Sequence, residues 1–354
     1  MITAAPPTNQ TSDIALPNII LTGGSSALSI VGALFIFCSY SFIPPEKNFT
    51  RKLLMYLTVA DFVTAFGNMV GMVRYVTLYG TGPRVQNCSG HVKTEEEWLC
   101  KTQSILTTAS NMSSFLWTLV IAVHLWASVV LQSDKTKSRL ARFIYHVLCW
   151  AVPGAVVASI FGSLGEDYCF GTGVWCGIRS DLPHHEVEML MYIADIAWQL
   201  FSYIASCFLL VFIIFYLRMK RLNIGEVRPF LRGEDRNYLY IWFVLYSLKL
   251  WGIIRFFLTT YMPADKLNTR HMKTFLKVLL YLQSYGASGQ AFWNCVVFCL
   301  LDRTVRIGFK NKLFGCKAET RPLLHEDSDK LFCCNPCIQT YPDDQYNVSR
   351  DSDR

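Results

Sequence analysis

The segment LLMYLTVADFVTAFGNMVGMV, residues 53–73, decides the fold class, because it is almost wholly apolar and yet contains one carboxylate, Asp61. About 20 apolar residues are what an α-helix needs to cross the hydrocarbon core of a bilayer. A carboxylate within such a helix is costly, so it is expected to face the interior of a helix bundle or a watery cavity. The segment therefore predicts one helix of a multi-pass membrane protein.

The composition of the whole chain points the same way. Of the 354 residues, 52% are hydrophobic and only 17% are charged, and the mean hydropathy is +0.28, which leaves too little charge to cover a soluble domain of this size. The apolar runs lack the alternation of barrel strands, so we expect an all-α membrane protein with seven transmembrane helices, at 19–42, 53–76, 105–131, 143–164, 189–217, 238–261 and 275–301. Residues 1–18 precede the bundle, residues 302–316 are expected to form an amphipathic surface helix, and residues 317–354 a disordered tail.

The distribution of Lys and Arg predicts the orientation. The loops 44–52, 132–142 and 218–237 together hold thirteen of these residues, the alternate set of loops holds seven, and the tail adds nine to the richer side. Positive charge gathers on the cytoplasmic side of membrane proteins, so we expect the N-terminus outside and the tail in the cytoplasm. The net charge of +7 then reflects topology and contact with an anionic lipid bilayer, and not nucleic-acid binding.

Several modification sites follow from this topology. Four cysteines are expected outside, where disulfides persist, and they allow three connectivities: Cys88, Cys100, Cys169 and Cys176. The sequons at Asn9 and Asn87 are expected to be glycosylated. Cys316, at the end of the expected surface helix, is a candidate for palmitoylation.

Polar residues within the spans predict a buried layer near the cytoplasmic third of the bundle. From the expected helix ends, Asp61, His124 and Asn294 lie at similar depth, and Asn68 follows Asp61 on the same face of its helix. Lys249 lies in the middle of the sixth span and needs a partner, for which Asp61 is a candidate. Two interpretations remain open: a switch whose hydrogen bonds exchange between two helix arrangements, or polar contacts that only hold helices together.

A second polar group lies nearer the expected external ends of the helices. Asp195 and Arg255 share a depth of roughly 10 Å, so they are able to pair between the fifth and sixth helices. For Arg74 and Lys277 the alternative is that they extend to the membrane surface without any ligand. The candidate ligand pocket consists of Arg74, Asp195, Trp198, Trp251, Arg255, Lys277, Tyr281 and Gln283.

Local motifs carry a resemblance to G-protein-coupled receptors. Cys100, at the outer start of the third helix, and Cys176 in VWCGI resemble the receptor disulfide that joins this helix to the second external loop. SSFLWTLVIAVHLW, residues 113–126, resembles the third helix of the secretin family and of slime-mould cyclic-AMP receptors. The Asp-Arg-Tyr and Asn-Pro-x-x-Tyr motifs of the rhodopsin family are absent from the corresponding regions.

A closer resemblance covers residues 20–316 and is to the orphan G-protein-coupled receptor 157 family. The order and spacing of its segments carry it: LTVADF, NMSSFLWT, WAVPG, VWCGI, GEVRPFL, LWGIIRFFL and NCVVFCLLDRTVR. The resemblance implies a receptor for an unknown extracellular ligand that acts on a heterotrimeric G protein, with the Gq and phospholipase C branch as its expected pathway. It also implies residence in the plasma membrane, the ciliary membrane included.

Two other function classes were weighed against a receptor. An intramembrane zinc enzyme needs several histidines and carboxylates in one layer, and the spans contain only His124 and His146, so we expect no enzyme activity, no metal and no cofactor. A seven-helix transporter or channel without G-protein coupling is the remaining alternative, disfavoured because the chain shows no internal repeat.

Overall fold

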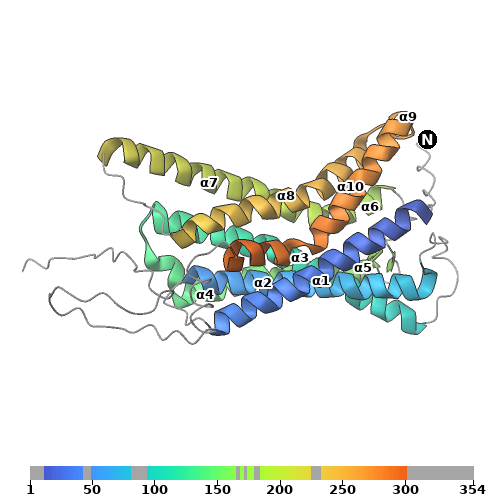
Figure 1. Cartoon of the computed structure of the whole chain (residues 1–354), viewed down its shortest axis with the longest axis horizontal. Coiled ribbons are helices and arrows are strands. Elements are labelled where there is room, and N and C mark those ends of the chain that lie inside the picture. The colour runs from blue at the N-terminus through green and yellow to red at the C-terminus, as the bar shows by residue number, and fades with distance from the viewer. Residues whose placement is uncertain are drawn as a thin grey trace, which may run out of the picture.

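A computed structural model of the chain describes residues 12–42, 49–80, 94–164, 168–170, 174–178, 184–224 and 233–300. Long helices run side by side along the longest axis of the molecule (Figure 1). The short helix α9 (Ala264–Leu267) lies at one end, here called the α9 end, and α4 (Arg139–His146) lies toward the opposite end, here called the α4 end.

The remaining helices follow in chain order. The first half of the chain forms α1 (Ser12–Phe42), α2 (Phe49–Tyr79), α3 (Thr94–Val129), the 3₁₀ turn η1 (Asp134–Lys137), the π-helical turn η2 (Val147–Ala151) and α5 (Val152–Leu164). The second half forms α6 (His184–Met191), the π-helical turn η3 (Tyr192–Ile196), α7 (Ala197–Ile224), α8 (Gly233–Tyr261), α10 (Arg270–Ser288), α11 (Gln290–Cys295) and the π-helical turn η4 (Val296–Leu300).

The prediction of a helical membrane bundle is confirmed. Within the described ranges, six helical stretches are long and apolar enough to cross a membrane: Ala15–Ser41, Phe49–Leu78, Trp98–Val129, Arg139–Ile160, His185–Met219 and Trp242–Tyr261. The seventh expected span is α10 followed by α11 and η4, and only its shorter part, Gln290–Cys299, is apolar enough. The reason is local, because the first turns of α10 carry cationic side chains and Gly289 interrupts the helix between α10 and α11.

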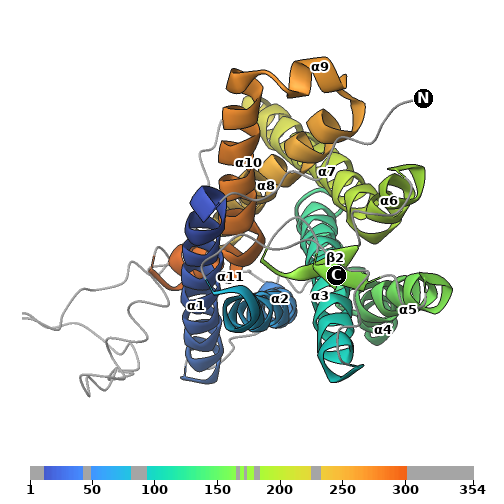
Figure 2. The same ribbon diagram turned by 90° about the vertical axis from the view of Figure 1, so that its right-hand side faces the viewer.

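A short hairpin adds two strands to the helices. β1 (Tyr168–Phe170) and β2 (Cys176–Ile178) pair antiparallel, with Phe170 opposite Cys176. A disulfide joins Cys176 to Cys100, near the start of α3, so the expected link between these two cysteines is present. The hairpin is thereby fixed to the α9 end of α3, where β2 lies over that end in the view of Figure 2.

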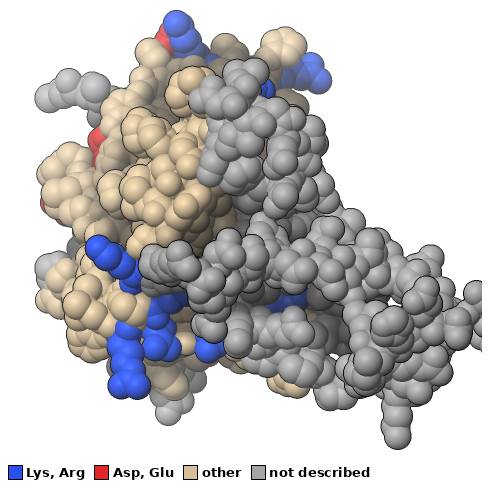
Figure 3. All heavy atoms as spheres, turned by 90° about the vertical axis from the view of Figure 1, so that its left-hand side faces the viewer, with Lys and Arg blue, Asp and Glu red and all other residues tan. Residues whose placement is uncertain are grey.

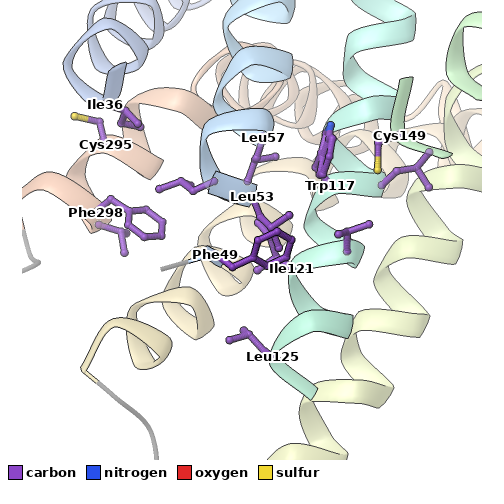
Figure 4. Close-up of a cluster of buried hydrophobic side chains, with 14 of the residues drawn as sticks. Ile36, Phe49, Leu53, Leu57, Trp117, Ile121, Leu125, Cys149, Cys295 and Phe298 are labelled. Carbon is purple, nitrogen blue, oxygen red and sulfur yellow. The ribbon is translucent and has the colours of Figure 1, made fainter. Parts of the chain in front are cut away.

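Figure 2, seen along the bundle, shows α2 between α1 and α3, and the three pack as neighbours. Their apolar side chains, together with others from η2, α7, α11 and η4, form a core in the half of the bundle nearer the α4 end (Figure 4). Trp117 of α3 is fully buried there, and Leu53 and Leu57 of α2 point toward the same cluster. Burial of such side chains determines which faces of α2 and α3 meet.

Glycines allow some of these helices to approach closely. A Cβ placed on Gly32 of α1 would lie 2.9 Å from the Cα of Phe292 in α11. A Cβ on Gly286 of α10 would overlap the carbonyl oxygen of Leu248 in α8. Small residues at contacts of this kind are typical of membrane helices, where packing replaces the hydrophobic effect as the source of helix association.

Several expectations lie outside the described residues. These are the sequons at Asn9 and Asn87, the amphipathic helix over 302–316 with Cys316, and the tail over 317–354.

Candidate functional site

Asp61 is buried between three helices and makes two hydrogen bonds. Its Oδ1 accepts from the hydroxyl of Ser114 on α3 at 2.7 Å, and its Oδ2 accepts from the Nδ2 of Asn294 on α11 at 2.8 Å. Gln290, one turn before Asn294, donates from Nε2 to the oxygen of Ser114 at 2.8 Å. We call these four residues the Asp61 cluster. It joins α2, α3 and the broken seventh helix through side chains alone.

Asp61 and Asn294 therefore lie together as the sequence predicts, whereas His124 lies elsewhere. The Nδ1 of His124 is 2.8 Å from the Oγ1 of Thr136 in η1, and its ring packs against Phe49 at 4.9 Å between centroids. His124 is ten residues along α3 from Ser114, about 15 Å nearer the α4 end. It joins α3 to the loop that follows this helix and does not reach Asp61.

Asn68 belongs to a second contact farther toward the α9 end. Its Nδ2 donates to the hydroxyl of Ser288 at 2.8 Å, and Ser288 is the last residue of α10 before the interruption at Gly289. Asp61 and Asn68 thus hold α2 to both sides of the break in the seventh helix. Because hydrogen bonds in a low dielectric are strong, these contacts fix the relative position of the two pieces.

Lys249 lies at a third polar site, where α3, η3, α8 and α10 meet. Its Nζ donates to the Oδ1 of Asn111 at 2.6 Å, and the Nδ2 of Asn111 donates to the Oδ1 of Asp195 at 2.8 Å. The ammonium also lies 5.4 Å from the centre of the Phe115 ring, within the range of a cation–π contact. Both Asp61 and Asp195 are within electrostatic range of Lys249, so they offset part of the cost of burying the ammonium, although it bonds directly to neither.

A cavity opens beside Lys249, and we call it the Lys249 cavity. It has a volume of about 60 Å³, and its walls are formed by Asn111, Asp195, Gln199, Leu248, Lys249, Gly252, Gln283 and Ala287. A single water needs on the order of 10–15 Å³ by this measure, so the cavity has room for a few waters or one small group. It is smaller than the pocket of a drug-sized ligand, roughly 300–1,000 Å³.

The candidate ligand residues from the sequence fall into two groups. Asp195 and Gln283 line the Lys249 cavity, and Arg255 is connected to it because its Nη1 donates to the Oε1 of Gln283 at 3.0 Å. The structure does not bring the other five to the walls of this cavity: Arg74, Trp198, Trp251, Lys277 and Tyr281.

The expected contact of Asp195 with Arg255 is replaced by contacts with neutral partners. Asp195 is bonded to Asn111, and Arg255 is bonded to Gln283. Arg74 donates to the Sγ of Cys176 at 3.7 Å, which places it beside the disulfide. The Trp198 indole donates to the carbonyl oxygen of Ile193 at 2.9 Å and is not available to the cavity.

Four polar residues that belong to these sites were not predicted from the sequence, namely Asn111, Ser114, Gln199 and Gln290. Gln290 was detectable, since it precedes Asn294 by four residues and so shares its helix face. Asn111 and Ser114 are three residues apart on α3, which also places them on one side of that helix. Their types are common in membrane helices, so composition alone gave no signal for them.

The α4 end carries a basic surface. Figure 3 shows Lys and Arg side chains gathered on this face, where much of the remaining surface is covered by residues that are not described. The exposed basic residues here are Lys52, Lys135, Lys137, Arg139, Arg142 and Arg218. An anionic membrane surface or an acidic protein surface is the complementary partner for such a face.

The Asp61 cluster contains buried acceptors that are not used by any described residue. No group of three or more histidines, cysteines or acids in the described ranges is placed to hold a metal ion. The Oδ1 of Asn294 and the Oε1 of Gln290 are buried and have no partner among the described residues, so acceptors are at hand for a different set of hydrogen bonds.

Comparison with known proteins agrees with these features. The chain is similar to the human protein named G-protein coupled receptor 157, with 26% identity over 80% of each chain, and to its mouse counterpart, with 25% identity over 80% of this chain and 81% of the relative. It is also similar to G-protein coupled receptor 1 of Arabidopsis thaliana, with 26% identity over 49% of this chain and 45% of the relative. The model of the slime mold cyclic AMP receptor family matches residues 26–205, more than half of the chain. The chain therefore belongs to the slime mold cyclic AMP receptor family.

Proposed function

We propose that this protein is a receptor that transmits an extracellular signal to heterotrimeric G proteins. The observation that carries the proposal is the similarity, over 80% of both chains, to proteins named as G-protein coupled receptors. The geometry adds a mechanism. A polar cavity lies between α3, α8 and α10, and buried polar contacts connect these helices to α2 and α11.

In this proposal the α9 end faces outside and the α4 end faces the cytoplasm. The disulfide of the hairpin supports this orientation, since disulfides persist outside the cell. The basic surface at the α4 end supports it as well, because Lys and Arg gather on the cytoplasmic side. The plasma membrane, including its ciliary region, is the proposed location, and the Gq and phospholipase C branch is the first pathway to test.

Signalling would follow from a shift between two arrangements of the bundle. A ligand that binds one arrangement more tightly raises the population of that arrangement. The size of the shift is set by the difference between the ligand's affinities for the two arrangements. The contact of Lys249 with Asn111 ties α8 to α3, and a ligand in the adjacent cavity alters the surroundings of both side chains. A change in the position of α8 then changes the surface presented at the α4 end.

Nucleotide exchange on purified heterotrimers tests this function directly. The chain would be reconstituted in nanodiscs with anionic lipid, and exchange measured with Gq, Gi and Gs heterotrimers in turn. We expect the chain to accelerate exchange on at least one of them, and Arg142→Glu to reduce that acceleration at least fivefold, because it reverses a charge on the basic surface.

Lys273→Glu is the matched control. It makes the same kind of charge change on an exposed residue of α10, toward the opposite end of the bundle. Equal effects of the two variants would mean that the α4 end is not the contact surface. No acceleration with any of the three heterotrimers, in the presence of folded protein, would count against the receptor function and favour a transporter or channel.

A further inference from the structure

Arg255 differs from Lys249 in having no described carboxylate within electrostatic range. It is half-buried in α8 and donates to Gln283, and no carboxylate among the described residues forms an ion pair with it. Lys249, by contrast, has two carboxylates within electrostatic range. A guanidinium removed from water is costly unless it is compensated, so this position of Arg255 calls for an anion.

Gln283, in the wall of the Lys249 cavity, connects the cavity to this cation. Gly252 lines the cavity and lies one turn before Arg255 on α8, on the same side of the helix. Gln283 lies between the two. Its Oε1 accepts from Arg255, its Nε2 has no partner in the described part of the chain, and a Cβ on Gly252 would lie 3.5 Å from that nitrogen. An unused donor therefore lies in the cavity wall, and the cation without a described ion-pair partner is bonded to the same side chain.

We propose that the Lys249 cavity binds the carboxylate of a small extracellular molecule, with Arg255 as the cationic partner and Gln283 as a second donor. The argument for a carboxylate is one of charge and size. A carboxylate and a phosphate both pair with the planar fork of a guanidinium. A carboxylate carries one negative charge, which equals the charge of Arg255, whereas a phosphate monoester carries about −1.5 to −2 at pH 7. The volume of about 60 Å³ accepts a group of a few heavy atoms.

The proposal that the carboxylate acts as a signal rests on the proposed receptor function. The binding test below does not depend on that function. The probe is acetate, with butyrate as a longer carboxylate, and with phosphate and chloride as other anions at equal ionic strength. The purified full chain in nanodiscs would be titrated with each, and the midpoint of thermal unfolding measured, because a ligand that binds the folded state raises this midpoint in a concentration-dependent way.

We expect acetate and butyrate to raise the midpoint of the native chain, and Arg255→Gln to weaken their apparent affinity at least tenfold. Arg255→Lys keeps the charge but not the planar fork and should retain part of the response. Lys273→Gln removes an exposed cation of α10 and should respond as the native chain does. Without any added anion, Arg255→Gln should melt at the same temperature as the native chain or higher, because an uncompensated charge has been removed.

A second variant keeps the proposal testable if Arg255→Gln fails to fold. Gly252→Ala adds one methyl group at ordinary van der Waals distance from Gln283, in a helix that alanine favours. It should fold at least as well as the native chain and still lose affinity for butyrate, because the cavity is narrower. An unchanged butyrate response in this variant would overturn the assignment of the cavity.

The other outcomes are equally decisive. Three outcomes would each overturn the proposal. The first is an equal acetate response in the native chain and in Arg255→Gln, and the second is a response to phosphate alone. The third is no response to either carboxylate at any concentration from 100-fold above that of the protein up to the solubility limit. Nucleotide exchange measured on the same preparation separates this from the receptor function. Nucleotide exchange without carboxylate binding would contradict the proposed carboxylate site and leave the receptor function standing. Carboxylate binding without nucleotide exchange would contradict the receptor function and leave the site standing.

Discussion

Asn294→Asp is the sharpest perturbation of the Asp61 cluster. It replaces the amide that donates to Asp61 with a second carboxyl group, whose oxygen would lie where Nδ2 now lies, 2.8 Å from Oδ2 of Asp61. A hydrogen bond to a charged acceptor, worth about 1.5–3 kcal/mol, is lost. Two like charges at this separation repel by about 6 kcal/mol at an effective dielectric constant of 20, and binding of a proton by either group limits this. We expect a net loss of about 3 kcal/mol in the free energy of unfolding.

Asp61→Asn in the same chain should restore much of this loss. The double variant again contains one amide and one carboxylate, with the direction of the hydrogen bond reversed. The hydroxyl of Ser114 then donates to the amide oxygen introduced at position 61. We expect a coupling free energy of about 2 kcal/mol or more, as is found for residues in direct contact.

The assay is a double-mutant cycle of equilibrium unfolding for the purified chain in mild detergent. Asn68→Asp is the matched control, because it makes the same change on a side chain whose partner is the hydroxyl of Ser288. Seven residues, about 10 Å along the helix, separate Asn68 from Asp61, so Asn68→Asp and Asp61→Asn should be additive within about 0.5 kcal/mol. If the Asp61→Asn/Asn294→Asp chain is no more stable than Asn294→Asp alone, the two side chains do not share a hydrogen bond.

Three further predictions concern other contacts. Gly286→Ala should prevent folding or lower the midpoint of thermal unfolding by at least about 5 °C, because its methyl group meets the backbone of α8. Gly154→Ala is the control, since nothing outside its own helix backbone lies within 4 Å of the added Cβ, and it should leave the midpoint unchanged or raised. Equal midpoints for the two variants would refute the close approach of α8 and α10. His124→Phe should speed hydrogen exchange of the amides around Thr136 at least tenfold, with amides at the α9 end as the internal reference, because the bond that holds η1 to α3 is lost. Lys249→Met should change the basal rate of nucleotide exchange by at least threefold while the chain still folds, because the contact of α8 with α3 is removed; an unchanged rate would mean that this contact does not govern the two arrangements.

The depth of individual residues within the membrane was the feature predicted least well from the sequence. The apolar runs indicated which segments are helices, but helices extend beyond their apolar parts. α2 begins at Phe49, four residues before the expected span, and α3 ends at Val129, two residues before the expected end. Asp61 is therefore twelve residues from the start of its helix and His124 five from the end of its own, a difference of about 10 Å in depth. This is why, of the two residues predicted to share its layer, Asn294 meets Asp61 and His124 does not.

The direction in which a side chain points from its helix was the second feature that could not be predicted reliably from the sequence. Asp195 and Trp198 are three residues apart, and regular α-helical spacing places them on one face. Asp195, however, lies in the π-helical turn η3, which ends at Ile196, so the register changes between the two residues. Asp195 lines the Lys249 cavity, whereas Trp198 bonds to the backbone of η3. A π-helical turn depends on packing around it, and the sequence gave no sign of it.

The contact of Gly286 with Leu248 has a mechanical consequence for α8. Because the two backbones touch there, α8 cannot slide past α10 at this level, and a tilt of α8 has to take place about this point, as a lever turns on its pivot. The arm on the far side of the pivot runs from Leu248 to Gly233, fifteen residues, or about 22 Å. A tilt of about 15° displaces the end of that arm by about 6 Å, while side chains at the Lys249 cavity, beside the pivot, shift by only a fraction of this distance.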